Sequence, residues 1–410
     1  MSNEPRFSIT SLFREHFSDF QSRHGVRIEE HRAAQAMIDC RSERLGRYEQ
    51  RCDNGHVEYE GFHSCHHRSC ARCNGSARHD WLDRIQSKLL PISHFHVIFT
   101  LPHEINDLWM HNRVWFSTQI FSIASESLKA LLRDPRHLGA EPSMLLAQHT
   151  WGRTLVFHPH VHALVSSGGL SGSRWLSCRP GYLVPGRALA TLYRGKWLGA
   201  LNQALGDGAL HLPPGRTEAW ARRQFRTLAR KRWNVRIEGR YDHGKGVAVY
   251  LSRYVRGGPM RDQRLAAMPS GQVSFLYRDH RDHQTKTMTL TRDAFMGRLL
   301  SHVPPERRHV IRYYGLYHSR ASQRLDRARS MLPEASAPMT KPVAIPPTCK
   351  ECRSPLKTVH YRRDENSLIR KGARRYVQQR VQADAPTCQS ISPSAATGPP
   401  LFFLSPGRAA

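Results

Sequence analysis

Residues 155–165 read Leu-Val-Phe-His-Pro-His-Val-His-Ala-Leu-Val, an apolar run long enough for one strand and interrupted by three histidines. Because side chains alternate across a strand, His158, His160 and His162 are expected to share one face. The apolar side chains between them are expected on the other face: Phe157, Val161 and Val165. Pro159 cannot donate to a sheet ladder, so we expect the strand to be regular only after it.

Three imidazoles on one core strand are costly unless something binds them. Neutral imidazole is the commonest metal-binding side chain, so the pattern favours a divalent metal site. The alternative is a set of hydrogen-bonded core histidines.

A second stretch, residues 250–254, reads Tyr-Leu-Ser-Arg-Tyr. A helix is predicted over about residues 245–256, ended by Gly257, Gly258 and Pro259. Tyr250 and Tyr254 would then lie one above the other on one helix face. Tyrosines at this spacing are usually core packing, but a histidine strand upstream in a very basic chain favours a functional pair.

The combination resembles the HUH endonucleases, and most closely the two-tyrosine rolling-circle transposases of bacterial insertion sequences. Three further motifs resemble that family in the same order: FTLP at 99–102, HTWG at 149–152 and RYYGL at 312–316. The resemblance spans roughly residues 40–317. It implies an α+β fold, in which an antiparallel sheet is flanked by helices and the tyrosine helix faces a central histidine strand. The predicted strands and helices, which lack regular βαβ alternation, are compatible with that class.

The resemblance implies cleavage and joining of single-stranded DNA through a 5′-phosphotyrosine. Tyr250 would make the first attack, and Tyr254 would be either the second nucleophile or packing. Lys245 and Arg253 lie close enough in the sequence to contact phosphate.

His160 and His162 match the family's metal-binding motif, and the family uses magnesium or manganese. A third ligand is needed, for which His158 is the first choice and Gln148 or His149 the alternatives. On intrinsic grounds imidazoles favour zinc- or nickel-type ions over magnesium.

The charge of the chain indicates a polyanionic partner. Its 410 residues contain 62 Lys and Arg against 33 Asp and Glu, a formal charge of +29. DNA is the natural partner, since phosphate neutralisation supplies most non-specific affinity. No apolar run approaches the length of a membrane span, and residues 1–14 lack a signal-peptide core. We therefore expect a cytoplasmic protein, associated with the nucleoid when bound to DNA.

A cysteine-rich stretch precedes the histidine strand and predicts a structural zinc site. Five of the nine cysteines fall between residues 40 and 73, which in a cytosolic chain indicates zinc rather than disulfides. One tetrahedral set is predicted, and a single zinc ion per chain: Cys52, His56, Cys70 and Cys73. The family usually has a cysteine where this chain has Gly55. The other possible ligands are Cys65, Cys40, His63 and His66.

The chain is predicted to divide into an N-terminal helix and zinc module (1–80), a catalytic domain (81–320) and a basic, Pro- and Ala-rich, disordered tail (321–410). Cys349 and Cys352 in the tail are either a degraded zinc knuckle or plain thiols. Within the catalytic domain, the predicted helix over 217–233 interleaves basic and aromatic residues, a pattern that suits single-stranded DNA. Its candidate DNA contacts are Arg222, Arg226 and Arg230. An amphipathic helix with a basic outer face is the alternative.

Two other functions remain open at this point. A replication initiator or relaxase would share the active site, although the zinc module and the RYYGL motif favour a transposase. A zinc-stabilised DNA-binding regulator without catalysis would fit the charge and the cysteines, but would leave both the histidine and the tyrosine patterns unexplained.

Overall fold

The computed structural model describes residues 7–73, 81–82, 84–85, 88–241, 258–268, 271–333, 347–361 and 368–369. The predicted tyrosine helix, with Tyr250, Tyr254, Lys245 and Arg253, lies outside the described residues. Within them, no helix is long and apolar enough to cross a bilayer.

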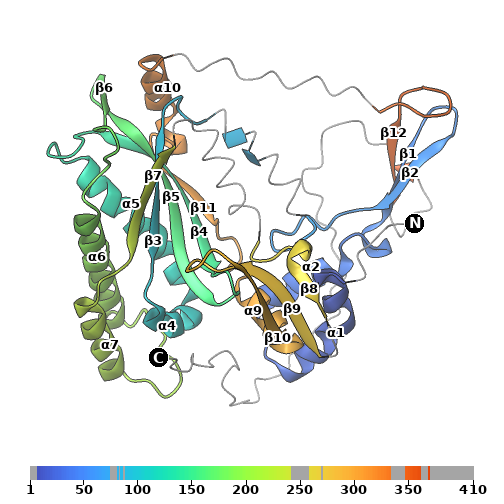
Figure 1. Cartoon of the computed structure of the whole chain (residues 1–410), viewed down its shortest axis with the longest axis horizontal. Coiled ribbons are helices and arrows are strands. Elements are labelled where there is room, and N and C mark those ends of the chain that lie inside the picture. Colours follow the sequence, from blue (N-terminus) through green and yellow to red (C-terminus); the bar gives the residue numbers. More distant parts are fainter. Residues whose placement is uncertain are drawn as a thin grey trace.

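An antiparallel sheet forms the centre of the largest body, which confirms the predicted α+β class (Figure 1). Its strand order is β11-β4-β5-β3-β7, with β6 paired to β5. In that order the strands span Ile311–Gly315, Glu141–Trp151, Phe157–Ser171, His94–Thr100, Val235–Tyr241 and Arg174–Ser177. The histidine stretch begins β5, the middle strand of the order, as the family resemblance implies.

Helices cover one face of this sheet. They are α4 (Asn106–His111), α5 (Arg113–Leu132), α6 (Gly186–Gly206) and α7 (Glu218–Arg230). Val161 and Val165 of β5 are buried in this core, and Phe157 packs against it. This confirms that Phe157, Val161 and Val165 point away from the histidines.

A smaller apolar cluster covers one end of the opposite face. Leu164 of β5 and Leu145 of β4 pack there with Trp81, Leu316 and residues of α10 (Ser322–Ser330). The other end of that face carries the histidines.

A second body joins the N-terminal helices to a later part of the chain. It comprises α1 (Ile9–Arg23), α2 (Ile28–Asp39), β8 (Leu265–Ala267), β9 (Gln272–Arg278), β10 (Thr285–Thr291) and α9 (Arg292–Ser301). The three phenylalanines of α1 are buried in one core with Phe275 and Phe295. Asp293 of α9 pairs with Arg23 and His24 at the end of α1. The first helices therefore share a core with residues that the sequence assigns to the catalytic domain.

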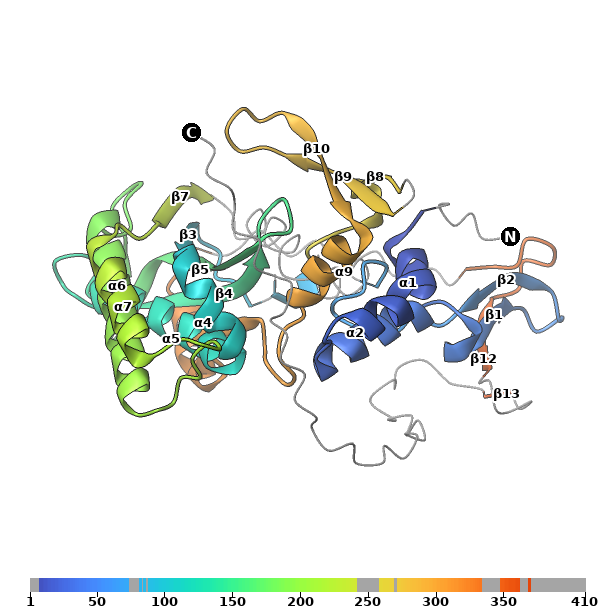
Figure 2. The same cartoon turned by 90° about the horizontal axis from the view of Figure 1, so that it is seen from below.

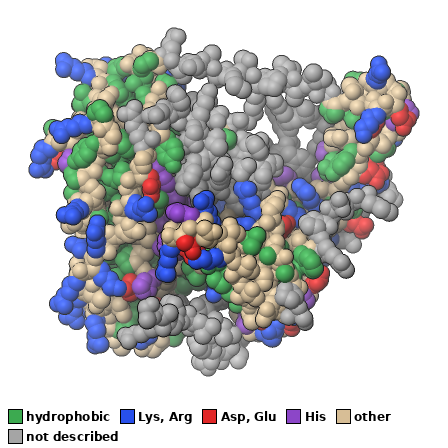
Figure 3. Space-filling model, viewed as in Figure 1, with side chains coloured by type: hydrophobic (Ala, Val, Ile, Leu, Met, Phe, Trp, Pro, Cys, Tyr) green, Lys and Arg blue, Asp and Glu red, His purple; other side chains and the backbone are tan. Residues whose placement is uncertain are grey.

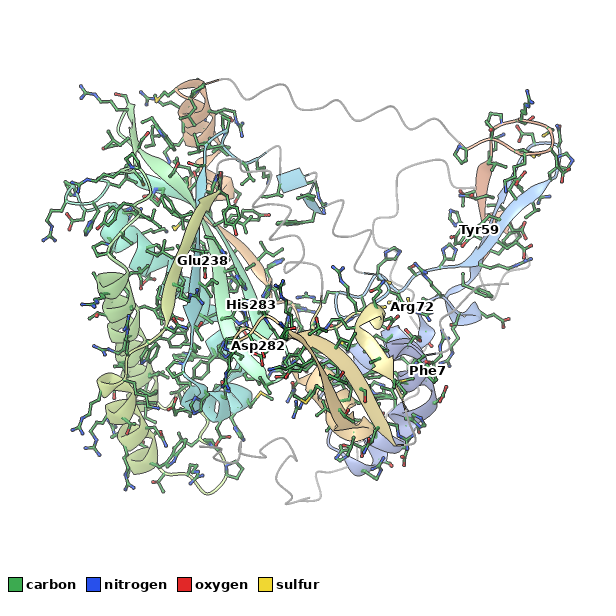
Figure 4. The ribbon with its side chains drawn as sticks, viewed as in Figure 1. Phe7, Tyr59, Arg72, Glu238, Asp282 and His283 are labelled. Carbon is green, nitrogen blue, oxygen red and sulfur yellow. The ribbon has the colours of Figure 1, made fainter. Side chains whose placement is uncertain are left out.

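The β9–β10 hairpin connects this body to the central sheet. Arg153, in the turn between β4 and β5, donates to the carbonyl of Arg278 at 2.6 Å. Figure 4 labels Asp282 and His283 at the hairpin tip, which overlaps the central sheet in this view.

A third body, at the right of Figure 2, is a small sheet whose strands come from residues 47–62 and 357–369. Its order is β13-β12-β1-β2, spanning Leu368–Ile369, Lys357–Tyr361, Arg47–Arg51 and Val57–Phe62. Here the structure differs from the expected disordered tail. Residues 322–330 form α10, and the alternating stretch 357–361 pairs antiparallel with β1, with Val359 opposite Glu49.

Candidate metal and DNA-processing site

The histidine strand meets a third imidazole from its neighbour. In the β4–β5 register His149 lies directly opposite His160, so both side chains share a face. The rings of His149 and His162 are 4.6 Å apart, and those of His160 and His162 4.9 Å. One ligand atom from each of the three residues lies within 4.8 Å of the other two, close enough to be drawn onto one ion.

His158, the first choice for the third ligand, is not in this cluster. Between Phe157 and His160 strand β5 has one more residue than the facing part of β4, so the alternation is broken there. The irregularity includes Pro159, which has no N–H for the ladder. His158 is exposed, whereas His149, one of the two alternatives, takes the third position. Gln148, the other alternative, lies opposite Val161 and so belongs to the helix-covered face.

Hydrogen bonds orient two of the three rings. His160 donates from Nδ1 to the carbonyl of His158 at 2.7 Å, which leaves Nε2 as its ligand atom. Nδ1 of His162 lies 2.9 Å from Nε2 of His96 on β3. If His162 donates in this pair, its Nε2 is also ready to bind metal. A backbone carbonyl such as that of His158 is a typical outer-shell partner of a histidine ligand.

His96 was not among the residues predicted for the site. The available signal was a histidine inside the otherwise apolar strand 95–99, and its partner could be identified only from the pairing of β3 with β5.

Burial keeps these imidazoles neutral at pH 7. It lowers the pKa of His160 to about 4, that of His96 to about 4, and that of His162 well below its ordinary value. Because a metal binds the neutral ring, His160 and His162 need no proton release before binding a cation at neutral pH.

A basic residue of β7 lies in the same row of the sheet. Ile98 of β3 pairs with His162 on one side and with Arg236 on the other, so Arg236 points to the histidine face. Arg236 is exposed and forms an ion pair with Glu238 at 3.2 Å. Figure 4 labels Glu238 over the central sheet. Arg236 could bind a phosphate there, a role that sequence reasoning missed.

The four predicted zinc ligands are divided between two separate clusters. Cys70 and Cys73 group with Cys40 and Cys65, whereas Cys52 and His56 group with Cys349 and Cys352 of the C-terminal segment. The single predicted set is therefore not brought together, because the two knuckles fold into different bodies. The sequence offered Cys40 and Cys65 as alternative zinc ligands. It offered no further ligands to complete a site with Cys349 and Cys352.

The Cys40 cluster lies in the core of the second body. The sulfurs of Cys40 and Cys65 are 3.4 and 3.5 Å from that of Cys73, and three of the four side chains are buried. Thiolates on one tetrahedral zinc at about 2.3 Å lie about 3.8 Å apart, so the set is compact enough to bind one zinc ion.

The candidate DNA contacts on α7 lie away from the histidines. Arg222, Arg226 and Arg230 are all exposed on the outside of the helical layer, on the far side of the sheet from the cluster. Figure 3 shows Lys and Arg side chains gathered along this outer edge. Phe225 and Trp233 are buried in the core and present no ring for base stacking. The structure thus fits the amphipathic-helix alternative.

Comparison with known proteins places this arrangement in a family. Residues 144–324 match a family described as "Putative transposase", and residues 12–101 match a "Transposase zinc-binding domain". A protein named "Putative transposase y4qJ" from Sinorhizobium fredii is 34% identical over 334 residues, covering 79% of this chain and 84% of the relative. The chain belongs to the two-tyrosine rolling-circle transposase family of bacterial insertion sequences.

A second relative of this transposase is the "Transposase for insertion sequence element IS801" from Pseudomonas savastanoi pv. phaseolicola. It is 28% identical over 307 residues, covering 72% of each chain. No solved structure matches the chain. The transposase match contains the whole histidine cluster, and the zinc-binding match contains the Cys40 cluster.

The geometry of this transposase predicts a difference between two histidines. His149→Ala should weaken Mn²⁺ binding at the cluster by at least about tenfold, since even an outer-shell partner of a metal site is worth about 10- to 100-fold. His158→Ala should change it little, because the carbonyl that accepts from His160 belongs to the backbone. Titration of Mn²⁺ followed by electron paramagnetic resonance measures both affinities. The reverse order of effects would restore His158 as the third ligand.

Proposed function

We propose that this transposase cleaves and rejoins single-stranded DNA through 5′-phosphotyrosine intermediates, as rolling-circle transposition requires. The observation that carries the proposal is the grouping of His149, His160 and His162 on a sheet face, where burial keeps the rings of His160 and His162 neutral. Such a set can hold a divalent cation against a DNA phosphate.

The segment that carries the tyrosines begins and ends near this cluster. Strand β7 ends at Tyr241, whose ring is 6.5 Å from that of His96. On the other side of the segment, Gly258 lines a cavity together with Trp151. The ring of Trp151 stacks on the ring of His149, with 4.6 Å between the ring centres. Both attachments support a role for residues 242–257, and so for Tyr250 and Tyr254, in chemistry at the cluster.

The proposed first step is an exchange at phosphorus. The Tyr250 oxygen loses its proton and bonds to phosphorus, the bond from phosphorus to the 3′ oxygen breaks, and that oxygen takes up a proton and leaves as the 3′ hydroxyl. Tyrosine has an ordinary pKa of about 10, so it needs help to react at neutral pH. Tyr254 would provide the second covalent event.

The proposed cation is Mg²⁺ or Mn²⁺, which when bound would act as a Lewis acid on the scissile phosphate. The donor set fits a divalent ion, although three imidazoles alone would suit zinc- or nickel-type ions better. Phosphate and water oxygens would supply the remaining hard ligands. His96 would hold the ring of His162, and Arg236 would offer positive charge to the phosphate on the same face.

The remaining proposed contacts are electrostatic and structural. We propose that the exposed arginines of α7, with Lys245 and Arg253, contact the DNA backbone, and that zinc in the Cys40 cluster stabilises the N-terminal body. The protein would act in the cytoplasm, on the nucleoid.

The proposal is tested by trapping the intermediate. End-labelled single-stranded DNA from the ends of the element, incubated with the purified protein and Mg²⁺, should yield a protein–DNA band that survives denaturing electrophoresis. The same sequence as a duplex serves as the control and should give far less product. Cleavage that releases only free 5′-phosphate ends, with no adduct at any time, would contradict a tyrosine intermediate.

Affinity for single-stranded DNA should fall steeply with salt, because a chain with a formal charge of +29 is expected to neutralise many phosphates. With six or more phosphate contacts, the affinity is expected to drop about a thousandfold or more between about 50 and 200 mM salt. Fluorescence anisotropy across that range gives the slope of log affinity against log salt. A nearly flat line would mean that the charge excess lies away from the DNA.

A further inference from the structure

Two turns from opposite ends of the described chain meet at the tip of the small β1-β2-β12 sheet. The first, between β1 and β2, carries Cys52 and His56, and the N–H of Cys52 donates to the carbonyl of His56 at 3.1 Å. It turns through Gly55, whose φ of +88° is a conformation that L side chains rarely adopt.

The second turn, just before β12, carries Cys349 and Cys352. The N–H of Cys349 donates to the carbonyl of Ser354, and the N–H of Arg353 donates back to the carbonyl of Cys349. Each turn is closed by its own backbone hydrogen bonds, and each presents two metal-ligating groups to the other.

The distances between these groups suit one tetrahedral ion. Nδ1 of His56 lies 3.5 Å from the sulfur of Cys52 and 3.6 Å from that of Cys349, and the sulfurs of Cys52 and Cys352 are 3.5 Å apart. Zinc with bonds of about 2.3 Å to sulfur and about 2.0 Å to nitrogen places a nitrogen and a sulfur about 3.5 Å apart. A disulfide, at about 2.05 Å, does not describe the Cys52–Cys352 pair.

The ring of His56 is oriented for this role. Its Nε2 lies 3.1 Å from a carboxylate oxygen of Glu351, within the second turn. A carboxylate accepts a hydrogen bond, so Nε2 carries the proton and Nδ1, the nitrogen that faces the sulfurs, is left with its lone pair. Donation of the second ring N–H to a carboxylate is the usual arrangement of a histidine bound to metal.

The sheet itself has little apolar core to hold it together. In strands β1, β2 and β12, only the side chains of Glu49 and Val359 are buried. Tyr361 donates to Glu49 at 2.8 Å, and Lys357 pairs with Asp53 at 2.6 Å. Small domains with so little core need additional stabilisation, of which a structural metal ion is one common source.

We propose that Cys52, His56, Cys349 and Cys352 bind a second structural zinc ion, separate from the one in the Cys40 cluster. Cys52 and Cys352 are 300 residues apart in the chain, so the ion ties the C-terminal segment to the N-terminal part. We call the site formed by these four residues the terminal zinc clasp. The whole histidine-bearing sheet lies between its two halves in the sequence. The inference does not depend on the proposed chemistry of DNA cleavage.

Metal content of the purified full chain tests the clasp. The wild type should contain two zinc ions per chain, and Cys349→Ser with Cys352→Ser should contain one. Cys178→Ser, at a cysteine outside both clusters, is the matched control and should keep two. In the double variant, X-ray absorption should show the remaining zinc bound by sulfur alone, because the site with a nitrogen ligand has been removed.

Variants of His56 separate loss of the metal from misfolding. His56→Cys offers a fourth sulfur and should retain two zinc ions, whereas His56→Ala should bind the second ion at least about tenfold more weakly. Hydrogen exchange of the full chain should show lost amide protection in residues 357–361 of His56→Ala and unchanged protection in α1 and α2. One zinc ion in the wild type, or two retained after Cys349→Ser with Cys352→Ser, would overturn the proposal.

Discussion

Replacing both Tyr250 and Tyr254 by Phe is expected to abolish the covalent protein–DNA adduct while leaving DNA affinity unchanged. Phe keeps the ring and removes only the oxygen that would bond to phosphorus, so packing is preserved and the nucleophile is lost. The expected drop is to the detection limit of the labelled gel, because no other group is proposed to form the bond.

The single variants divide the two roles. Tyr250→Phe should remove the first adduct, whereas Tyr254→Phe should still nick but fail to complete strand transfer. Tyr241→Phe, at the end of β7, is a matched control that changes a neighbouring tyrosine and should leave the adduct intact. Mass spectrometry of the trapped peptide identifies the residue. An adduct that persists in the double variant would place the nucleophile elsewhere.

Loss of His160 and His162 together is expected to stop cleavage just as completely. The double variant His160→Ala with His162→Ala lacks two of the three clustered metal ligands. A bound metal ion of this kind supplies several kcal/mol of transition-state stabilisation. Each 1.4 kcal/mol is tenfold, so a rate loss of about a thousandfold or more is expected. Initial nicking rates at saturating Mn²⁺ measure it.

Two comparisons show that this loss comes from the metal site. Zinc content should be unchanged in the double histidine variant, because both cysteine-containing clusters are intact. Wild-type protein stripped with EDTA should regain cleavage when Mg²⁺ or Mn²⁺ is added back. Undiminished cleavage by the double variant would refute the metal assignment.

What could be predicted from the sequence was local. The shared face of His160 and His162 follows from alternation along one strand. Val161 and Val165 are buried on the other face of the sheet, which confirms it.

What could not be predicted depended on pairing between distant elements. Whether His149 or His158 joins the cluster is set by the β4–β5 register and by the irregularity at Pro159. The partners of Cys52 come from a segment 300 residues away, and spacing within one knuckle carries no information about that distance. Neighbouring cysteines therefore looked like one ligand set although they belong to two.

The core shared by α1, α2 and α9 also constrains the order in which the chain can fold. The first helices leave the ribosome with three apolar rings whose partners, Phe275 and Phe295, are synthesised more than 250 residues later. Contacts of such high sequence separation form slowly and leave apolar surface exposed meanwhile. We therefore expect a chimera that joins residues 1–80 of a relative to residues 81–410 of this chain to aggregate.

A chimera that takes residues 258–303 from the same relative as well should fold, because both halves of the shared core then come from one protein.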